Sequence, residues 1–190
     1  MGQYYKAIVL NKTKETPIGF VSPYDFGSGA KLMESSWMKN DYVGFVEGML
    51  LLEPRPIVWG GDYADEEPST NQNLYSMCDT APKITHDADI PNDKSKYDFD
   101  FKTVLPKRFK YLVNHDKKEF VDKSKTPSND GWQIHPLPLL TCEGNGRGGG
   151  DFRGDGTHLV GRWSRDVIGV TSKKSDIPKD FKEVIFDLSE

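Results

Sequence analysis

Short apolar runs separated by polar turns follow one another along the chain, and their spacing predicts more strands than helices. Residues 4–10 are rich in aromatic and β-branched side chains, which predicts a buried strand. Pro17–Val21 predicts a returning edge strand, because proline cannot donate to a sheet ladder. Residues 109–114 and 119–121 flank a polar turn and predict a hairpin. Further buried strands are predicted at 55–59, 134–140, 166–170 and 183–188.

Two stretches have the spacing of helices with one buried face. The first is residues 30–38, and the second begins at the capping residue Asn40 or Asp41 and ends before Pro54. A short third helix is predicted near residues 70–77. Because the strands do not alternate regularly with helices, the predicted fold class is α+β rather than Rossmann-like. We expect a largely antiparallel sheet with two or three helices.

The length of 190 residues predicts a single compact domain over residues 1–190. A domain of this size buries roughly 70% of its unfolded surface, so it needs no disulfide or metal to fold. The polar, acidic stretch 79–100 contains proline and few apolar anchors, which predicts an exposed excursion from the domain.

Charge and cysteine content narrow the classes of partner. A net charge of −4 argues against general binding to nucleic acid or to an anionic membrane. The chain shows no signal peptide and no apolar run of the roughly 20 residues that span a bilayer, which predicts a cytoplasmic location. The chain has two cysteines, Cys78 and Cys142, which fits a reducing environment. The sequence is also compatible with one disulfide bridge between them. Both a monomer and a homo-oligomer are compatible with the sequence.

Glycine and arginine are concentrated in residues 142–165. Seven glycines lie between Gly144 and Gly156, and four of the six arginines fall in this window. Glycines let main-chain N–H groups approach an anion closely, and the arginine fork pairs with phosphate or carboxylate. The segment therefore predicts a pocket for a small anionic, nucleotide-like ligand. The residues predicted to bind it are Asn145, Arg147, Gly148, Gly149, Arg153, His158, Arg162 and Trp163.

A structural interpretation of the same segment stays open. In it, the arginines pair with Asp151, Asp155 and Asp166 across a tightly turning loop. The pattern is no Walker loop, and the G-x-G-x-x-G match at 144–149 lacks the βαβ unit that gives it meaning. One copy of a calcium-binding glycine repeat, at 148–151, is too few. No metal and no cofactor are predicted.

Several residues outside this segment have both a functional and a structural interpretation. Asp62 and Asp65 follow a predicted strand, where ligand groups often bind, but acids in a turn are usually solvated. His135 fits a core histidine, and the polar group His86, Asp87 and Asp89 fits solvated side chains better than a metal site. Trp132 and Trp163 could each stack on a base or belong to the core. If the protein is an enzyme, the residues predicted as acid, base or metal ligand are Asp62, Asp65, His135 and Asp151.

Five stretches spread over the whole chain resemble a family of small, mostly uncharacterised proteins of bacteriophages and bacteria. They are residues 1–5 (MGQYY), 31–34 (KLME), 59–65 (WGGDYAD), 111–116 (YLVNHD) and 135–154. A phage setting implies a sponge that sequesters a nucleotide-derived immune signal in the host cytoplasm. No catalytic residue carries over from the resemblance.

Three functions follow from the residues and the resemblance. The first is capture of a nucleotide-derived ligand without turnover. The second is hydrolysis of a phosphoester or glycosidic bond in such a ligand. The third is a protein-interaction module in which the acidic stretch 62–100 docks a partner.

Overall fold

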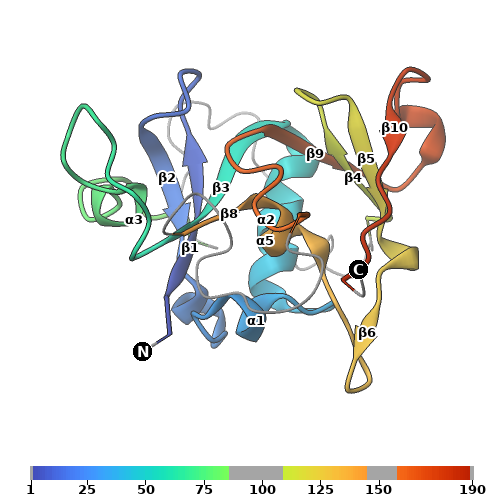
Figure 1. Ribbon diagram of the computed structural model, residues 1–190, viewed down its shortest axis with the longest axis horizontal. Helices are drawn as coiled ribbons and strands as arrows, with labels where there is room; N and C mark the ends of the chain where they lie inside the picture. The colour runs from blue at the N-terminus through green and yellow to red at the C-terminus, as the bar shows by residue number, and fades with distance from the viewer. Residues whose placement is uncertain (1, 86–108, 145–157, 189–190) are drawn as a thin grey trace.

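The computed structural model describes residues 2–85, 109–144 and 158–188 (Figure 1). Within these residues the strands form an eight-stranded sheet and a separate two-stranded sheet. In chain order the elements are β1 (Tyr5–Leu10), β2 (Pro17–Val21), the 3₁₀ helix η1 (Pro23–Phe26), α1 (Leu32–Ser35), α2 (Asp41–Leu52), β3 (Arg55–Gly61), α3 (Leu74–Met77), β4 (Tyr111–Asn114), β5 (Glu119–Asp122), η2 (Lys123–Lys125), β6 (Ser128–Asn129), β7 (Trp132–Gln133), α5 (Pro136–Thr141), β8 (Cys142–Glu143), β9 (Val167–Thr171), η4 (Lys174–Asp176) and β10 (Lys182–Glu183).

The large sheet has the strand order β10-β5-β4-β9-β3-β1-β2. The eighth strand, β8, lies off this path and pairs with β3. Most neighbours are antiparallel, but β3 with β8 and β5 with β10 are parallel. Figure 1 shows β1 and β2 at one end of the sheet and β4, β5 and β10 at the other. The prediction of an α+β fold with a largely antiparallel sheet is confirmed.

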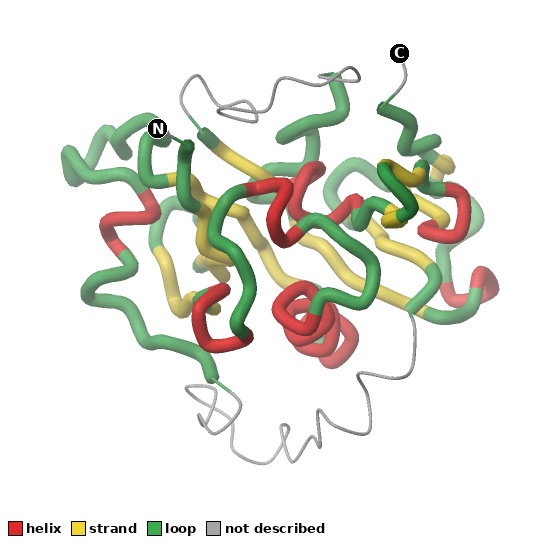
Figure 2. The backbone as a smooth tube through the Cα atoms, turned by 90° about the horizontal axis from the view of Figure 1, so that it is seen from below, coloured by secondary structure: helices red, strands yellow, loops and turns green. Residues whose placement is uncertain are grey.

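Both faces of the sheet are covered, and β1 shows how the sequence divides between them. Successive side chains of a strand point to opposite faces. Tyr5, Ala7 and Val9 pack into the main core with α2, whereas Ile8 and Leu10 pack into a smaller cluster with α3. Figure 2 shows α2 nearly end-on against the strands. The near-continuous apolar composition of β1 follows from burial on both faces.

Helix α2 begins and ends as the sequence predicts. The Asn40 side chain accepts hydrogen bonds from the main-chain N–H groups of Tyr42 at 3.0 Å and Val43 at 3.3 Å. These are two of the donors that a helix leaves unpaired at its start. The helix ends at Leu52, just before Pro54.

The strand predicted at 134–140 is wrong, because Pro136–Thr141 forms helix α5. Proline at the first helical position lacks only an N–H that would have no partner there. The His135 ring caps the helix, since its Nδ1 accepts the N–H of Leu137 at 3.2 Å. The leucines of this stretch are nonetheless buried in the main core, as predicted.

Three other elements are shorter than predicted. In α1 the hydroxyls of Ser35 and Ser36 both donate to the main-chain carbonyl of Leu32, at 3.3 Å and 2.7 Å. This carbonyl is the one that another helical turn would use, so the helix stops and Trp37 instead forms a bridge with Ile134. The helix near 70–77 is reduced to α3, and the strand at 183–188 to β10.

Strand β2 lies at the sheet edge, as predicted, but part of its outer side is covered. The N–H of Phe20 donates to the Pro82 carbonyl at 3.1 Å, and the N–H of Ile84 donates to the Phe20 carbonyl at 2.8 Å. Ile84 is buried over Gly19, where a Cβ would lie 2.8 Å from Ile84 Cδ1. The described start of the predicted excursion, residues 79–85, is therefore attached to the sheet, and the rest of it lies outside the described residues.

Cys78 and Cys142 are free and buried, so the bridge left open by the sequence is not formed. Burial raises the pKa of each thiol to about 12. In the parts of the chain that the structure describes, no helix combines the length and the apolar character required to span a membrane.

Candidate functional site

The parallel pairing of β3 with β8 brings two separately predicted segments together. Gly60 of β3 lies opposite Glu143 of β8 in the ladder. Because the two strands run in the same direction, both end at the same edge of the sheet (Figure 1). The acidic turn at 62–65 and Gly144, the first residue after β8, therefore follow neighbouring strand ends. We call this place the β3–β8 edge and define it by residues 60–63, 143–144 and Tyr4.

The described residues of the β3–β8 edge include a fixed carboxylate and two exposed rings. The N–H of Tyr4 donates to Asp62 Oδ1 at 3.0 Å, and the N–H of Asp62 donates to the Tyr4 carbonyl at 2.9 Å. The Asn73 side chain donates to the Asp62 carbonyl at 3.0 Å and so ties the turn to α3. Tyr63 is 53% exposed and Tyr4 43% exposed. Exposed aromatic rings of this kind can stack on a base.

Arg162 and Trp163 both donate hydrogen bonds to one carboxylate, that of Glu119 in β5. Trp163 is fully buried, and its Nε1 donates to Glu119 Oε2 at 2.9 Å. Arg162 forms a forked ion pair with the same carboxylate, through Nε at 3.3 Å and through Nη2. Burial alone would raise the pKa of Glu119, but the hydrogen bonds from Arg162 and Trp163 outweigh it and hold the pKa below its usual value. Trp163 is thus a core residue, and the charge of Arg162 is neutralised.

The remaining arginine of the described segment is also paired. Arg165 lies between Glu67 and Glu143. The structural interpretation, in which the arginines pair with acids, therefore holds for Arg162 and Arg165. The partners are glutamates, whereas the sequence suggested aspartates. Asp166, one of those suggested, instead pairs with Lys117 and accepts a hydrogen bond from Asn114 at 2.8 Å.

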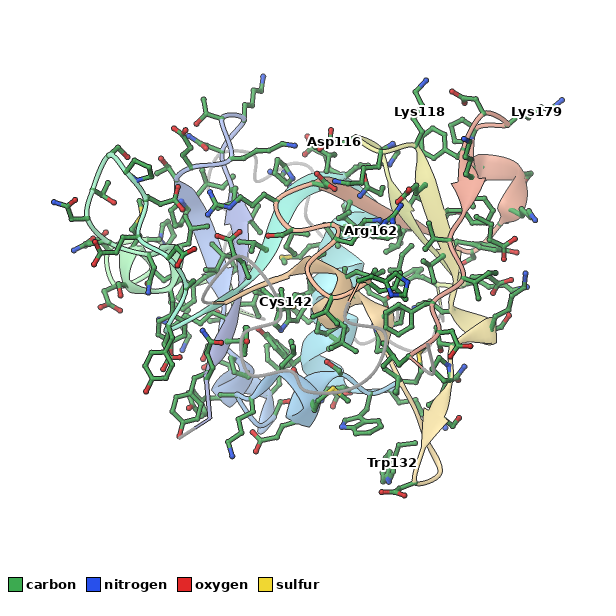
Figure 3. The ribbon with its side chains drawn as sticks, in the orientation of Figure 1. Asp116, Lys118, Trp132, Cys142, Arg162 and Lys179 are labelled. Carbon is green, nitrogen blue, oxygen red and sulfur yellow. The ribbon has the colours of Figure 1, made fainter. Side chains whose placement is uncertain are left out.

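Most of the other predicted ligand-binding residues lie outside the described residues. They are Asn145, Arg147, Gly148, Gly149 and Arg153, together with Asp151 of the hydrolase hypothesis and His86, Asp87 and Asp89 of the metal hypothesis. His158 is exposed in the turn where the described chain resumes. Trp132 is exposed on the β6–β7 hairpin, and Figure 3 shows it well separated from Cys142 at the start of β8.

Of the residues predicted for a hydrolase, the three that the structure describes have separate surroundings, with His135 in the core and Asp62 and Asp65 in the turn after β3. His135 is buried and contacts Glu47 at 3.2 Å and Lys123 at 3.4 Å. Asp62 instead contacts Tyr4 and Asn73 at the β3–β8 edge, and Asp65 is exposed. Over residues 2–85, 109–144 and 158–188, no three His, Cys, Asp or Glu side chains are grouped to hold a metal ion.

The sequence analysis missed the buried group formed by Glu47, Lys123 and His135. The Glu47 carboxylate pairs with the Lys123 ammonium on one oxygen and with His135 on the other. Burial opposes ionisation of Glu47, but its two partners hold the pKa of the carboxyl below its usual value. A signal was present, because Glu47 interrupts the apolar face of a helix whose other inward residues are hydrophobic.

The structure thus defines an α+β protein in which two predicted ligand segments leave a mixed sheet at one edge. Comparisons of the chain with protein-family models, with curated proteins and with solved structures found no match.

Proposed function

We propose that this protein binds a small anionic, nucleotide-derived ligand at the β3–β8 edge and holds it without chemical change. The observation that carries the proposal is the parallel register of Gly60 with Glu143. This register brings the end of β8, after which the glycine-rich stretch of the sequence follows, next to the end of β3, after which Asp62 and the exposed Tyr63 follow, and Tyr4 is bonded to Asp62. Ligands of open α/β sheets bind outside the carboxyl ends of the strands for the same reason of chain geometry.

The β3–β8 edge and the glycine-rich stretch that follows it in the sequence offer groups for different parts of a nucleotide. The exposed ring of Tyr63 or Tyr4 offers a stacking surface for a base, worth roughly 1–3 kcal/mol per base. Arg147 and Arg153 are the arginines of the segment that remain for the phosphate, because Arg162 and Arg165 are paired with glutamates. Arg147 and Arg153 lie outside the described residues, so their role rests on the composition of the sequence.

The resemblance to phage proteins suggests the biological use of such a site. A sponge for a host immune signal needs affinity and no catalytic group. This part of the proposal concerns cyclic dinucleotides and isomers of cyclic ADP-ribose, which are nucleotide-derived anions.

Incubation of the pure protein with these nucleotides, followed by heat release and mass spectrometry, tests the proposal. We expect at least one nucleotide to be retained through gel filtration and released intact. Release of an altered nucleotide would support the hydrolase instead. Retention of none of them would contradict the proposal.

Substitutions locate the site. Tyr63→Ala and the double change Arg147→Ala with Arg153→Ala are each expected to raise the dissociation constant at least tenfold in calorimetric titrations. Trp132→Ala is the matched control, because Trp132 is an exposed aromatic residue well separated from the start of β8 (Figure 3). Its dissociation constant should stay within twofold of the unsubstituted protein. If Tyr63→Ala, the double arginine variant and Trp132→Ala all lost affinity equally, the effect would not be local to the β3–β8 edge.

A further inference from the structure

Arg165 joins three separate segments of the chain through one guanidinium group. Its Nε donates to Glu143 Oε2 at 2.7 Å, and its Nη1 donates to Glu67 Oε2 at 3.1 Å and to the Lys14 carbonyl at 3.2 Å. Its Nη2 donates to the second oxygen of each glutamate. All the N–H groups of the fork thus face acceptors of the protein. Arginine is the one side chain whose planar fork can serve two carboxylates in this way.

The two glutamates are almost completely buried around this fork. Each side chain is 4% exposed, and that of Arg165 is 13% exposed. Burial alone would lower the pKa of Arg165, but its hydrogen bonds to both carboxylates outweigh it and raise the pKa. The hydroxyl of Ser164 adds a further hydrogen bond to Glu143 Oε2, at 2.8 Å. A buried carboxylate that lost these donors would be left without compensation.

The main chain of Arg165 is held as firmly as its side chain. Its N–H donates to the Ile57 carbonyl at 3.0 Å, so the residue is attached to β3 just before β9 begins. Its φ of 65° lies in the left-handed region, which is uncommon for a residue with a side chain. A conformation of this kind persists where the surrounding contacts determine it, and such residues cluster at functional sites.

The partners of Arg165 border the β3–β8 edge. Glu143 is the last residue of β8 and directly precedes the glycine-rich stretch. Glu67 belongs to the loop that carries Asp62 and Tyr63, and its N–H donates to the Gln72 carbonyl at 2.8 Å to close a turn in that loop. The fork of Arg165 therefore sets the position of the loop that carries Glu67 relative to the end of β8.

We propose that Arg165 is a positioning residue for ligand binding: it fixes the 62–73 loop against the end of β8 and has no N–H group left for the ligand. The inference rests on the proposed function of the β3–β8 edge. Of the two arginines of the segment that the structure describes, Arg165 is the more enclosed, and the inference gives it a role different from the phosphate contact that its sequence neighbourhood suggests.

The test compares Arg165→Lys with Arg55→Lys in two measurements. Arg55 is a matched control, since it also pairs with a glutamate, Glu53 at 2.6 Å, but it does so at the start of β3. Hydrogen exchange without ligand reports on the loop, and titration with whichever cyclic nucleotide the unsubstituted protein retains reports on the site. Both are measured well below the melting temperature of each variant.

In Arg165→Lys, which keeps the charge and loses the fork, we expect two changes. The amides of Ala64 and Glu67, which donate to the Gly61 and Gln72 carbonyls, should exchange at least tenfold faster, whereas the amides of α2 should not change. The dissociation constant should rise at least tenfold. A role confined to stability would not alter the affinity of the folded protein. Arg55→Lys should leave both quantities within twofold.

Each contrary result has one meaning. If the unsubstituted protein retains no nucleotide, the proposed function is wrong. Separately, unchanged hydrogen exchange of the loop amides in Arg165→Lys would overturn the positioning of the loop. Faster exchange with an unchanged dissociation constant would overturn the link to ligand binding. If Arg165→Lys does not fold, Glu67→Gln gives the same two measurements, because it weakens the loop contact while the pair of Arg165 with Glu143 stays in place.

Discussion

His135 is held in one protonation state by its neighbours. Its Nδ1 accepts the N–H of Leu137, so the ring proton lies on Nε2, which donates to Glu47 at 3.2 Å. The Lys123 ammonium lies 3.4 Å from the same nitrogen and has only donors, so it repels any further proton on the ring. Burial is the largest cause that lowers the pKa of His135. A second proton would also remove the cap of α5.

We therefore expect the free energy of unfolding to fall as the pH is lowered from about 7 to 5. The unfolded histidine takes up a proton near its ordinary pKa of about 6.5, and the folded one does so only at lower pH. Unfolding is thus favoured by at most about 1.4 kcal/mol per pH unit for this group. At lower pH, protonation of Glu47, whose folded pKa is lowered, removes further stability.

Urea unfolding of the unsubstituted protein and of His135→Asn, from pH 5 to 8, checks this prediction. Asparagine cannot be protonated but can still cap α5. The variant should therefore lose the part of the slope that His135 contributes. His115, whose pKa burial also lowers, contributes the same slope to both proteins and cancels in the comparison. Identical slopes in the two proteins would contradict the assignment.

The outer edge of β2 is covered in part by one short segment. An uncovered edge presents a row of free N–H and carbonyl groups on which another chain can pair. Here residues 82–84 occupy part of that row and bury Ile84 against Gly19. The ion pair of Lys83 with Asp25, at 2.7 Å, holds the same segment from its exposed side.

Ile84→Ala is expected to detach this segment. Removing a buried isoleucine side chain costs roughly 2–5 kcal/mol. The amide of Phe20 should then exchange faster with solvent, while that of Ala7 in β1 should not, and the protein should associate more as its concentration rises. Ile18→Ala is the control, because Ile18 lies on the same strand but is 42% exposed. Equal protection of Phe20 in both variants would show that the segment does not cover the edge.

On the scale of the whole molecule, the described residues bury their hydrophobic side chains in one main core and two smaller clusters. The main core contains α2, α5 and Cys142, and the smaller cluster on the other face of β1 contains α3 and Cys78. Few residues bury the smaller cluster, and α3 is only four residues long. Small clusters with short helices open at lower free energy than the main core.

The two thiols report this difference directly. With pKa values raised to about 12, neither is a thiolate to any useful extent at pH 8, and both are buried. Alkylation should therefore require opening, and mass spectrometry should find Cys78 modified at least tenfold faster than Cys142 without denaturant. In 8 M urea the two rates should converge. Equal rates in the native protein would mean that the two cores open as one unit.

The local pattern of the sequence predicted much of the fold correctly. Asn40 caps the start of α2, and the helix ends before Pro54, as predicted. The 109–121 hairpin forms where Asn114 can accept the turn N–H groups of Asp116 and Lys117. The pattern predicted the wrong element at 134–140, because a short run of leucines is compatible with both a buried strand and a short buried helix. Here the His135 side chain caps a helix.

The sequence by itself determined the class of fold, the position of the main helix and the segment in which glycine and arginine gather, since these depend on composition and local spacing. The tertiary structure decided which arginines are paired, that Trp163 belongs to the core, and that residues 60–63 lie beside residue 143. These outcomes depend on partners far away in the chain, such as Glu119 and Glu67, and no local pattern indicates which distant carboxylate a guanidinium will meet.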